Sequence, residues 1–114
     1  MAYILAMSTA LHLTEVMKTL ADPTRRAVFE RIARQDEITA GALVTGTRVS
    51  QPAVSQHLRA LREAGLVTER REGRHVHYRV RRQGLSPLVG WLEFYAEFWT
   101  KRLDNLERLL SEMD

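Results

Sequence analysis

The hydrophobic pattern of this chain changes its period at Gly65, and this change limits the folds that the chain can adopt. Before Gly65, apolar residues recur every three or four positions, as in amphipathic helices. After it, residues 66–71 and 75–80 change to a period of two around Glu72-Gly73-Arg74, which predicts a β-hairpin with glycine in its turn. A chain of 114 residues has room for one modest core. We therefore predict a single domain, residues 1–114, that is mainly α-helical with one β-hairpin.

Start and stop signals divide the rest of the chain into about five helices. Asp22 before Pro23, and Ser50 before Gln51-Pro52, are typical of helix N-termini, because their side chains accept hydrogen bonds from free backbone N–H groups. Gly65 is typical of the residue after a helix. The expected helices span residues 8–20, 23–34, a short stretch between Thr39 and Gly46, 51–64 and 86–113. In the second helix we expect four residues to face the core, namely Ala27, Val28, Phe29 and Ile32.

The charge of the chain is concentrated in its middle third. Residues 47–85 contain nine arginines against three glutamates, a net charge of +6, whereas residues 1–46 are neutral and residues 86–114 carry −3. Arginine presents a planar fork that suits phosphate and guanine. This basic segment favours nucleic acid as the partner, and the alternative is a solvated basic face.

The helix at residues 51–64 has an exposed face that could read DNA bases. With Val54, Leu58 and Leu61 turned inward, a rotation of about 100° per residue sets the outward face. Glutamine pairs well with adenine, arginine with guanine and serine with either. Free backbone N–H groups at the start of such a helix suit a phosphate. The outward face carries Pro52, Ser55, Gln56, Arg59 and Glu63, with Gln51 and Arg62 at its edges.

The predicted hairpin offers a second contact with nucleic acid. Arg70, Arg71 and Arg74 surround its tip, and a two-stranded ribbon with arginines at its tip can lie along a minor groove or a phosphate backbone. His75 and Tyr78 are candidate phosphate donors. Taken singly, each of these residues could equally be a solvated or cross-strand residue, so the prediction rests on the cluster. Three more arginines follow, at positions 79, 81 and 82.

Three stretches carry a resemblance to a known family: Leu20-Ala-Asp-Pro-Thr-Arg-Arg-Ala-Val, residues 49–67 and residues 70–78. Together they resemble the winged helix-turn-helix repressors of the arsenical-repressor (ArsR/SmtB-like) family over about residues 12–82. The resemblance implies a helix-turn-helix at residues 38–64, a wing at 66–82, and a homodimer that binds an inverted-repeat operator and represses its own operon. The predicted DNA-binding residues are Ser50, Gln51, Ser55, Gln56, His57, Arg59, Arg62, Arg70, Arg71, Arg74, His75 and Tyr78.

The chain lacks the residues of two metal sites that many members of that family use. It has no cysteine, residues 38–46 contain no Cys, His or carboxylate, and residues 86–114 contain no His. Glu93 with Glu97 and His75 with His77 are better explained as solvated pairs than as metal ligands. His57 lies about 60° from the inward stripe of its helix, so a packing role is as plausible as a base contact. We expect no metal and no cofactor, and an effector, if one exists, would be non-metal.

The last helix has more apolar surface than one chain can cover. Trp91, Phe94 and Phe98 widen its apolar stripe, and such a helix needs its own domain on one side and a second chain on the other. The alternatives are that everything packs within one subunit, or that the aromatic band borders a small apolar ligand. The predicted dimer interface combines both end helices and comprises Leu13, Val16, Met17, Leu92, Tyr95, Trp99, Leu103, Leu106 and Leu110.

Several other classes of protein are disfavoured. No run of 18 apolar residues occurs, and the apolar start lacks a basic segment before it, so neither a transmembrane helix nor a signal peptide is expected. Met7 could be the natural start, with residues 1–6 an upstream extension. No cysteine nucleophile, phosphate loop or His–carboxylate metal motif supports an enzyme. We predict a cytoplasmic, sequence-specific DNA-binding regulator; the alternative is a protein–protein interaction module with non-specific affinity for DNA.

Overall fold

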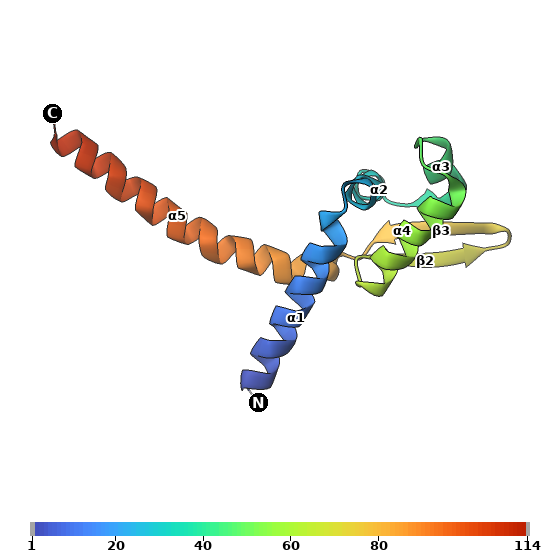
Figure 1. Cartoon of the computed structure of the whole chain (residues 1–114), viewed down its shortest axis with the longest axis horizontal. Helices are drawn as coiled ribbons and strands as arrows, with labels where there is room; N and C mark the ends of the chain where they lie inside the picture. Colours follow the sequence, from blue (N-terminus) through green and yellow to red (C-terminus); the bar gives the residue numbers. More distant parts are fainter. Residues whose placement is uncertain (1, 114) are drawn as a thin grey trace.

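The computed structural model describes residues 2–113, and the side chains of residues 10–113. Figure 1 shows α5 leaving the rest of the molecule beside α1 and extending away from the β2–β3 hairpin. The molecule is therefore 67 Å long but only 22 Å thick. The predicted fold class, mainly helical with one hairpin and a long last helix, is confirmed. The elements in chain order are α1 (Ala2–Ala21), α2 (Pro23–Ala33), β1 (Ile38–Thr39), α3 (Ala40–Thr45), α4 (Gln51–Glu63), β2 (Val67–Glu72), β3 (His75–Val80), the 3₁₀ helix η1 (Arg82–Leu85) and α5 (Ser86–Glu112).

The predicted helix caps form as expected. Asp22 Oδ1 accepts a hydrogen bond from the backbone N–H of Arg25 at 2.9 Å, and this bond lowers the pKa of the Asp22 carboxyl group. Thr39 and Ser50 cap α3 and α4 in the same way, each accepting from the N–H three residues ahead, at 3.1 and 3.4 Å. Gly65 follows α4 with a φ of +76°, the left-handed conformation that glycine adopts without a steric penalty. Short polar side chains thus set where these helices start.

Two predicted boundaries differ from the structure. The first helix was expected to start at Ser8, but α1 starts at Ala2. Residues 2–7 contain no glycine or proline and are rich in alanine, leucine and methionine, which favour helix, so α1 extends to Ala2. The segment between the hairpin and the last helix, for which no element is predicted, forms η1.

The hairpin is confirmed, and a third strand joins it. The order of strands in the antiparallel sheet is β1-β3-β2, with Val67 opposite Val80 and Glu72 opposite His75. Gly73 has a φ of +60° and Arg74 does not have a positive φ, which suits a two-residue type II′ turn. The unpredicted strand β1 is only two residues long and places Ile38 opposite Tyr78. Two residues are too few to show a periodic pattern, so β1 has no signal in the sequence.

One core lies between α2, α3, α4 and the sheet. The predicted inward stripe of α4 is confirmed, since Val54, Leu58 and Leu61 are at most 3% exposed. The prediction for α2 is correct for Val28, Phe29 and Ile32 but wrong for Ala27, which is exposed. Ala27 precedes Val28 by about 100° of helix rotation and so lies on the side away from Phe29 and Ile32. The full core comprises Val16, Val28, Phe29, Ile32, Ile38, Leu43, Val54, Leu58, Leu61, Leu66, Val67 and Tyr78.

The helices within residues 2–113 include none that is long and apolar enough to cross a membrane.

Gly84 in η1 lies directly against the backbone that follows α4. A Cβ at this position would overlap the carbonyl oxygen of Gly65 and approach Leu66 Cα to 3.1 Å. These atoms are backbone, so they cannot move aside as the end of a side chain could. Gly90 in α5 has open space where its Cβ would be. The close approach at Gly84 therefore fixes where the chain leaves the wing and enters α5.

We predict opposite effects for alanine at these two glycines. Gly84→Ala should lower the free energy of unfolding by about 1–3 kcal/mol, because the new methyl group overpacks a backbone contact. Gly90→Ala should raise it by roughly 0.5–1 kcal/mol, because alanine favours the helix. Urea unfolding at a fixed protein concentration measures both. An unchanged midpoint for Gly84→Ala would show that the contact at η1 is not tight in solution.

Candidate nucleic-acid interface

The outward face of α4 is polar and accessible. Gln51, Ser55, Gln56 and Arg59 are all exposed; the last three belong to the outward face of the helix, and Gln51 lies at its edge. Ser50, by contrast, uses its hydroxyl oxygen to cap α4. Its hydroxyl hydrogen remains free to donate to an incoming acceptor. The structure thus brings together amide, hydroxyl and guanidinium groups that suit the edges of bases.

His57 does not belong to this outward face. Its side chain is half-buried, and within the described residues its buried Nδ1 has no hydrogen-bond partner. The Arg25 N–H lowers the pKa of Asp22, and His57 adds to this effect, so the imidazole lies toward the start of α2. This position favours the packing role for His57 over the base contact. Its position about 60° from the buried stripe was the signal for a packing role.

Tyr78 is a core residue and not an exposed phosphate donor. It is 9% exposed, and its hydroxyl group donates to Glu69 Oε2 at 3.2 Å. Burial raises the pKa of Tyr78, and the Glu69 carboxylate raises it further. The alternation of Val76, Tyr78 and Val80 along β3 places all three on the inner side of the sheet, and this was the signal for its burial.

Arg62 and Arg70 already have acidic partners. Arg62 Nη1 lies 2.8 Å from Glu69 Oε2, which ties the end of α4 to β2. Arg70 donates from Nε and Nη2 to Glu37 Oε1 at 3.1 and 2.6 Å, and from Nη1 to Glu72 Oε2 at 2.8 Å. Both arginines were predicted to bind DNA, but a phosphate would have to compete with these carboxylates.

Glu37 was not singled out from the sequence, yet it anchors the wing. It lies in the α2–β1 connection, and besides Arg70 it has His77 Nδ1 at 3.3 Å from its Oε1. No pattern along the chain pairs Glu37 with residues more than thirty positions away. Only the pairing of β1 with β3 brings this carboxylate to the outer side of the sheet.

The remaining predicted cations are open to solvent. Arg59, Arg71 and Arg74 are exposed and form no ion pair within the described part of the chain, and His75 is exposed near the same tip. Arg71 pairs with Val76 in the register of the hairpin, so it lies on the side of the sheet that faces the core and α4. Arg71 and Arg70 therefore lie on opposite sides of the sheet, and Arg74 lies in the turn between the two strands.

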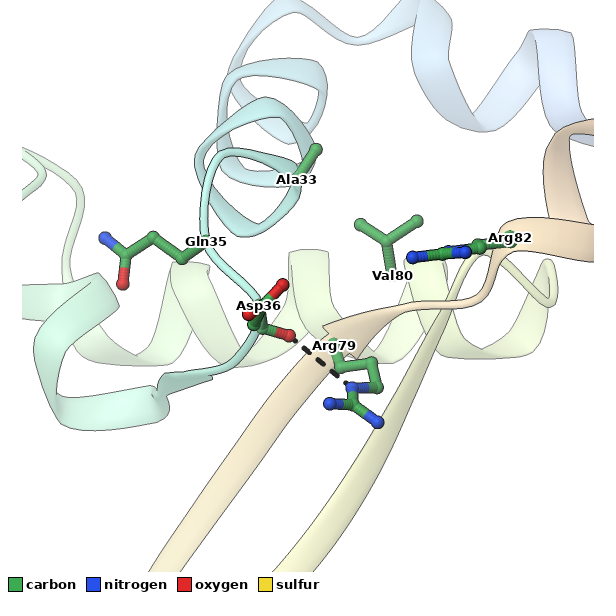
Figure 2. A pocket seen from close by; sticks show the side chains of 6 residues that line it. All are labelled: Ala33, Gln35, Asp36, Arg79, Val80 and Arg82. Atoms are coloured by element: carbon green, nitrogen blue, oxygen red, sulfur yellow. Dashed lines mark hydrogen bonds between the residues drawn. The ribbon is translucent and has the colours of Figure 1, made fainter.

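A hollow of about 470 Å³ lies behind the wing, lined by Ala33, Gln35, Asp36, Arg79, Val80 and Arg82. Figure 2 shows Arg79 bonded to the backbone of Asp36, with Arg82 beside Val80. The hydrogen bond runs from Arg79 Nε to the Asp36 carbonyl oxygen at 3.5 Å. This contact joins β3 to the connection after α2. The two arginines thus belong to the base of the wing and not to its tip.

The candidate metal ligands are not brought together. Within residues 2–113, no group of three or more His, Asp or Glu side chains is placed to hold a metal ion. His75 and His77 have ring centroids 6.4 Å apart, and His77 lies beside Glu37 and Glu72.

The residues predicted to form the dimer interface differ in how exposed they are in the single chain. Val16 is 2% exposed within its own chain, so its assignment to a dimer interface is wrong; it packs in the core. Leu13 is half-buried and Met17 is 37% exposed. The apolar side chains of α5 remain open, each at least 41% exposed: Leu92, Tyr95, Trp99, Leu103, Leu106 and Leu110.

We predict that Arg70 lowers the pKa of Glu72. The hydrogen bond from Arg70 is the largest cause of this lowered pKa, so Arg70→Gln should return it toward its ordinary value. Because the pKa is lowered in the folded state, the stabilisation from this pair is present at neutral pH and is lost as pH falls through that pKa. NMR titration of the carboxyl group measures the change. Arg71→Gln is the control on the other side of the sheet, and an equal shift from it would contradict the pairing.

Comparison with known proteins agrees with this geometry. A family model described as a helix-turn-helix domain matches residues 20–70. The HTH-type transcriptional regulator Rv2034 of Mycobacterium tuberculosis is 38% identical over 105 residues, which cover 92% of this chain and 94% of the relative. The arsenical resistance operon repressor of Escherichia coli is 39% identical, over 87% of this chain and 82% of the relative.

A solved structure agrees as well. The ArsR-like transcriptional regulator from Rhodococcus sp. RHA1 superposes with a TM-score of 0.71 at 30% identity, over 90% of this chain and 95% of that one. Proteins of this kind are DNA-binding regulators and not enzymes, in agreement with the sequence analysis. The chain belongs to the ArsR/SmtB family of winged helix-turn-helix transcriptional regulators.

Proposed function

We propose that this chain acts as a homodimer that binds an inverted-repeat operator and represses its own operon. The observation that carries the proposal is the outward face of α4, where Ser55, Gln56 and Arg59 are exposed. The wing adds Arg71 and Arg74, which are exposed and form no ion pair within the described part of the chain. A relative of this chain is named as the repressor of an operon. Because the partner is chromosomal DNA, we place the protein in the cytoplasm.

In the proposed complex, some side chains contact the bases and others contact the phosphate backbone. Gln51 and Gln56 would pair with adenine, Arg59 with guanine and Ser55 with either base, all in the major groove. Arg71, Arg74 and His75 would contact phosphates, as would the free N–H groups at the start of α4. Neither a cofactor nor a metal is needed for this binding.

The exposed side of α5 supports the dimer. Apolar side chains recur along it at spacings of three and four from Leu92 to Met113, so they form one continuous stripe. A stripe this long exceeds the apolar patches that monomers usually leave in water. Covering it with a second copy, together with Met17 and Leu13 of α1, would bury it. Two recognition helices roughly 34 Å apart could then enter successive major grooves.

Selection from genomic DNA tests the proposed function. Fragmented DNA of the source organism is captured on the purified protein at near-physiological salt and sequenced. Recovery of an inverted repeat with half-sites about one turn apart supports the proposal. Uniform recovery that is lost steeply as salt rises would instead indicate a basic surface without sequence specificity. In that case the protein–protein interaction module becomes the better explanation.

We predict that Arg59 and the wing arginines affect binding in different ways. Arg59→Ala should weaken operator binding by roughly 1–3 kcal/mol and random DNA far less, because it removes a base contact. Arg71→Ala and Arg74→Ala should weaken both and flatten the dependence of affinity on salt, because they remove phosphate contacts. Fluorescence anisotropy over a series of salt concentrations measures these effects.

The exposed Arg34 at the end of α2 provides a matched control for loss of positive charge. Arg34→Ala should leave both affinities close to those of the wild type. If Arg59→Ala weakens specific and random DNA equally, Arg59 has no reading role.

A charge within the α5 stripe should prevent dimerisation. Leu106→Glu places a carboxylate in the stripe, and burying it without a partner is costly. We expect dimerisation at least about tenfold weaker, since 1.4 kcal/mol corresponds to a factor of ten. Light scattering should give twice the chain mass of 13.1 kDa for the wild type and move toward 13.1 kDa for the variant.

Arg108→Glu is the control, because position 108 lies about 160° around the helix from position 106. It should leave the dimer intact. A wild-type protein with the mass of a single chain at micromolar concentration would contradict the dimer.

A further inference from the structure

Arg31 of α2 crosses to the C-terminal end of α3. Its Nη2 donates to the carbonyl oxygen of Ala42 at 2.9 Å, and its Nη1 donates to that of Leu43 at 3.1 Å. The carbonyl groups in the last turn of a helix carry partial negative charge. The carbonyl oxygen of Ala42 also accepts a hydrogen bond from the backbone N–H of Gly46, at 3.1 Å. A guanidinium group that spans two of these carbonyl groups acts as a clamp between α2 and α3.

Gly46 leaves the space that this clamp occupies. A Cβ at Gly46 would overlap the guanidinium group of Arg31 itself. The backbone of Gly46 has a φ of −89° and a ψ of 2°, which alanine also adopts, so no positive φ demands glycine here. Glycine is needed because of Arg31. Any side chain at position 46 would push the guanidinium group off the two carbonyl oxygens.

The short helix α3 depends on such contacts. It has six residues, far fewer than an isolated helix needs to be stable in water. Leu43 is its only fully buried residue, and Ala40 and Val44 pack against the core beside it. The turn that follows leads from Gly46 directly to Ser50, the residue that caps α4. The direction of α3 and its turn therefore sets how the start of α4 is presented.

We propose that Arg31 is a positioning residue for DNA binding: it holds the end of α3 through a space that Gly46 keeps open. The inference rests on the proposed function, because it assigns Arg31 a part in presenting α4 to the operator. Arg31 reads no base in this scheme. Its effect on affinity passes through the turn between α3 and α4.

The first test compares Arg31→Met and Gly46→Ala with matched controls. Either variant should release the clamp, speed amide hydrogen exchange in residues 43–49, and lower operator affinity about tenfold, the effect of losing hydrogen bonds to a charged group. The exposed Arg34, changed to methionine, controls for loss of an arginine on α2. Gly41 has open space around it, so Gly41→Ala controls for loss of a glycine in α3. Amide exchange in residues 43–49 should be as slow in both controls as in the wild type.

The second test asks whether the two changes act through one contact. The double variant should bind the operator no more weakly than Arg31→Met alone, because the added methyl group has nothing left to displace. Arg31→Lys should recover part of the affinity, since an ammonium group can still donate to a carbonyl oxygen. Additive losses in the double variant, or an unaffected Gly46→Ala, would overturn the proposal. So would a loss of affinity without faster exchange in residues 43–49.

The two readouts separate this inference from the proposed function. Amide exchange needs no DNA, so it reports on the clamp even if the wild type selects no operator, in which case the proposed function fails. If the wild type binds an operator and Arg31→Met binds it equally well, the proposed function stands and Arg31 has no positioning role.

Discussion

The candidate nucleic-acid interface depends on the packing of α4 against the core. Val54, Leu58 and Leu61 are buried against α2 and the sheet, and each such side chain stabilises the fold by about 1.5–3 kcal/mol. Because these three positions lie on one side of the helix, the opposite side has to face solvent. Those buried contacts thus expose Ser55, Gln56 and Arg59 together. The proposed DNA-reading face is therefore a consequence of where the apolar residues of α4 are.

The arginines of the middle third serve two purposes that composition alone could not separate. Arg62, at the end of α4, pairs with Glu69 of β2, and Arg70 pairs with Glu37 and Glu72 on the outer side of the sheet. Such exposed pairs contribute little stability individually, but they join the hairpin to α4 and to the α2–β1 connection. Arg71 and Arg74 form no ion pair within the described part of the chain, and we propose that they contact phosphate. The difference between the two groups comes from the alternation of side chains along β2, which places neighbouring residues on opposite sides.

The apolar residues of the chain fall into two sets, those of the core and those of the exposed stripe of α5. The core uses residues from α1 to β3, including Val16, and takes no fully buried residue from α5 within the described part of the chain. The stripe of α5 is thus left exposed after the chain has folded, which is why we propose that a second copy of the chain covers it. In the proposed dimer, an apolar ligand would have to compete with that second copy for the same aromatic side chains.

The sequence by itself determined the helices, their caps, the hairpin and the inward stripe of α4, because these depend on contacts only a few residues apart. It also placed Gln56 and Arg59 on the exposed face of α4, since helix rotation follows from spacing. Tertiary structure alone decided the pairing of Ile38 with Tyr78, the anchoring of Arg70 by Glu37, the burial of Val16 and of His57 Nδ1, and the contact of Arg31 beside Gly46. Each of these contacts joins groups that are distant in sequence or lie on different elements, and no periodic pattern along the chain predicts such a contact.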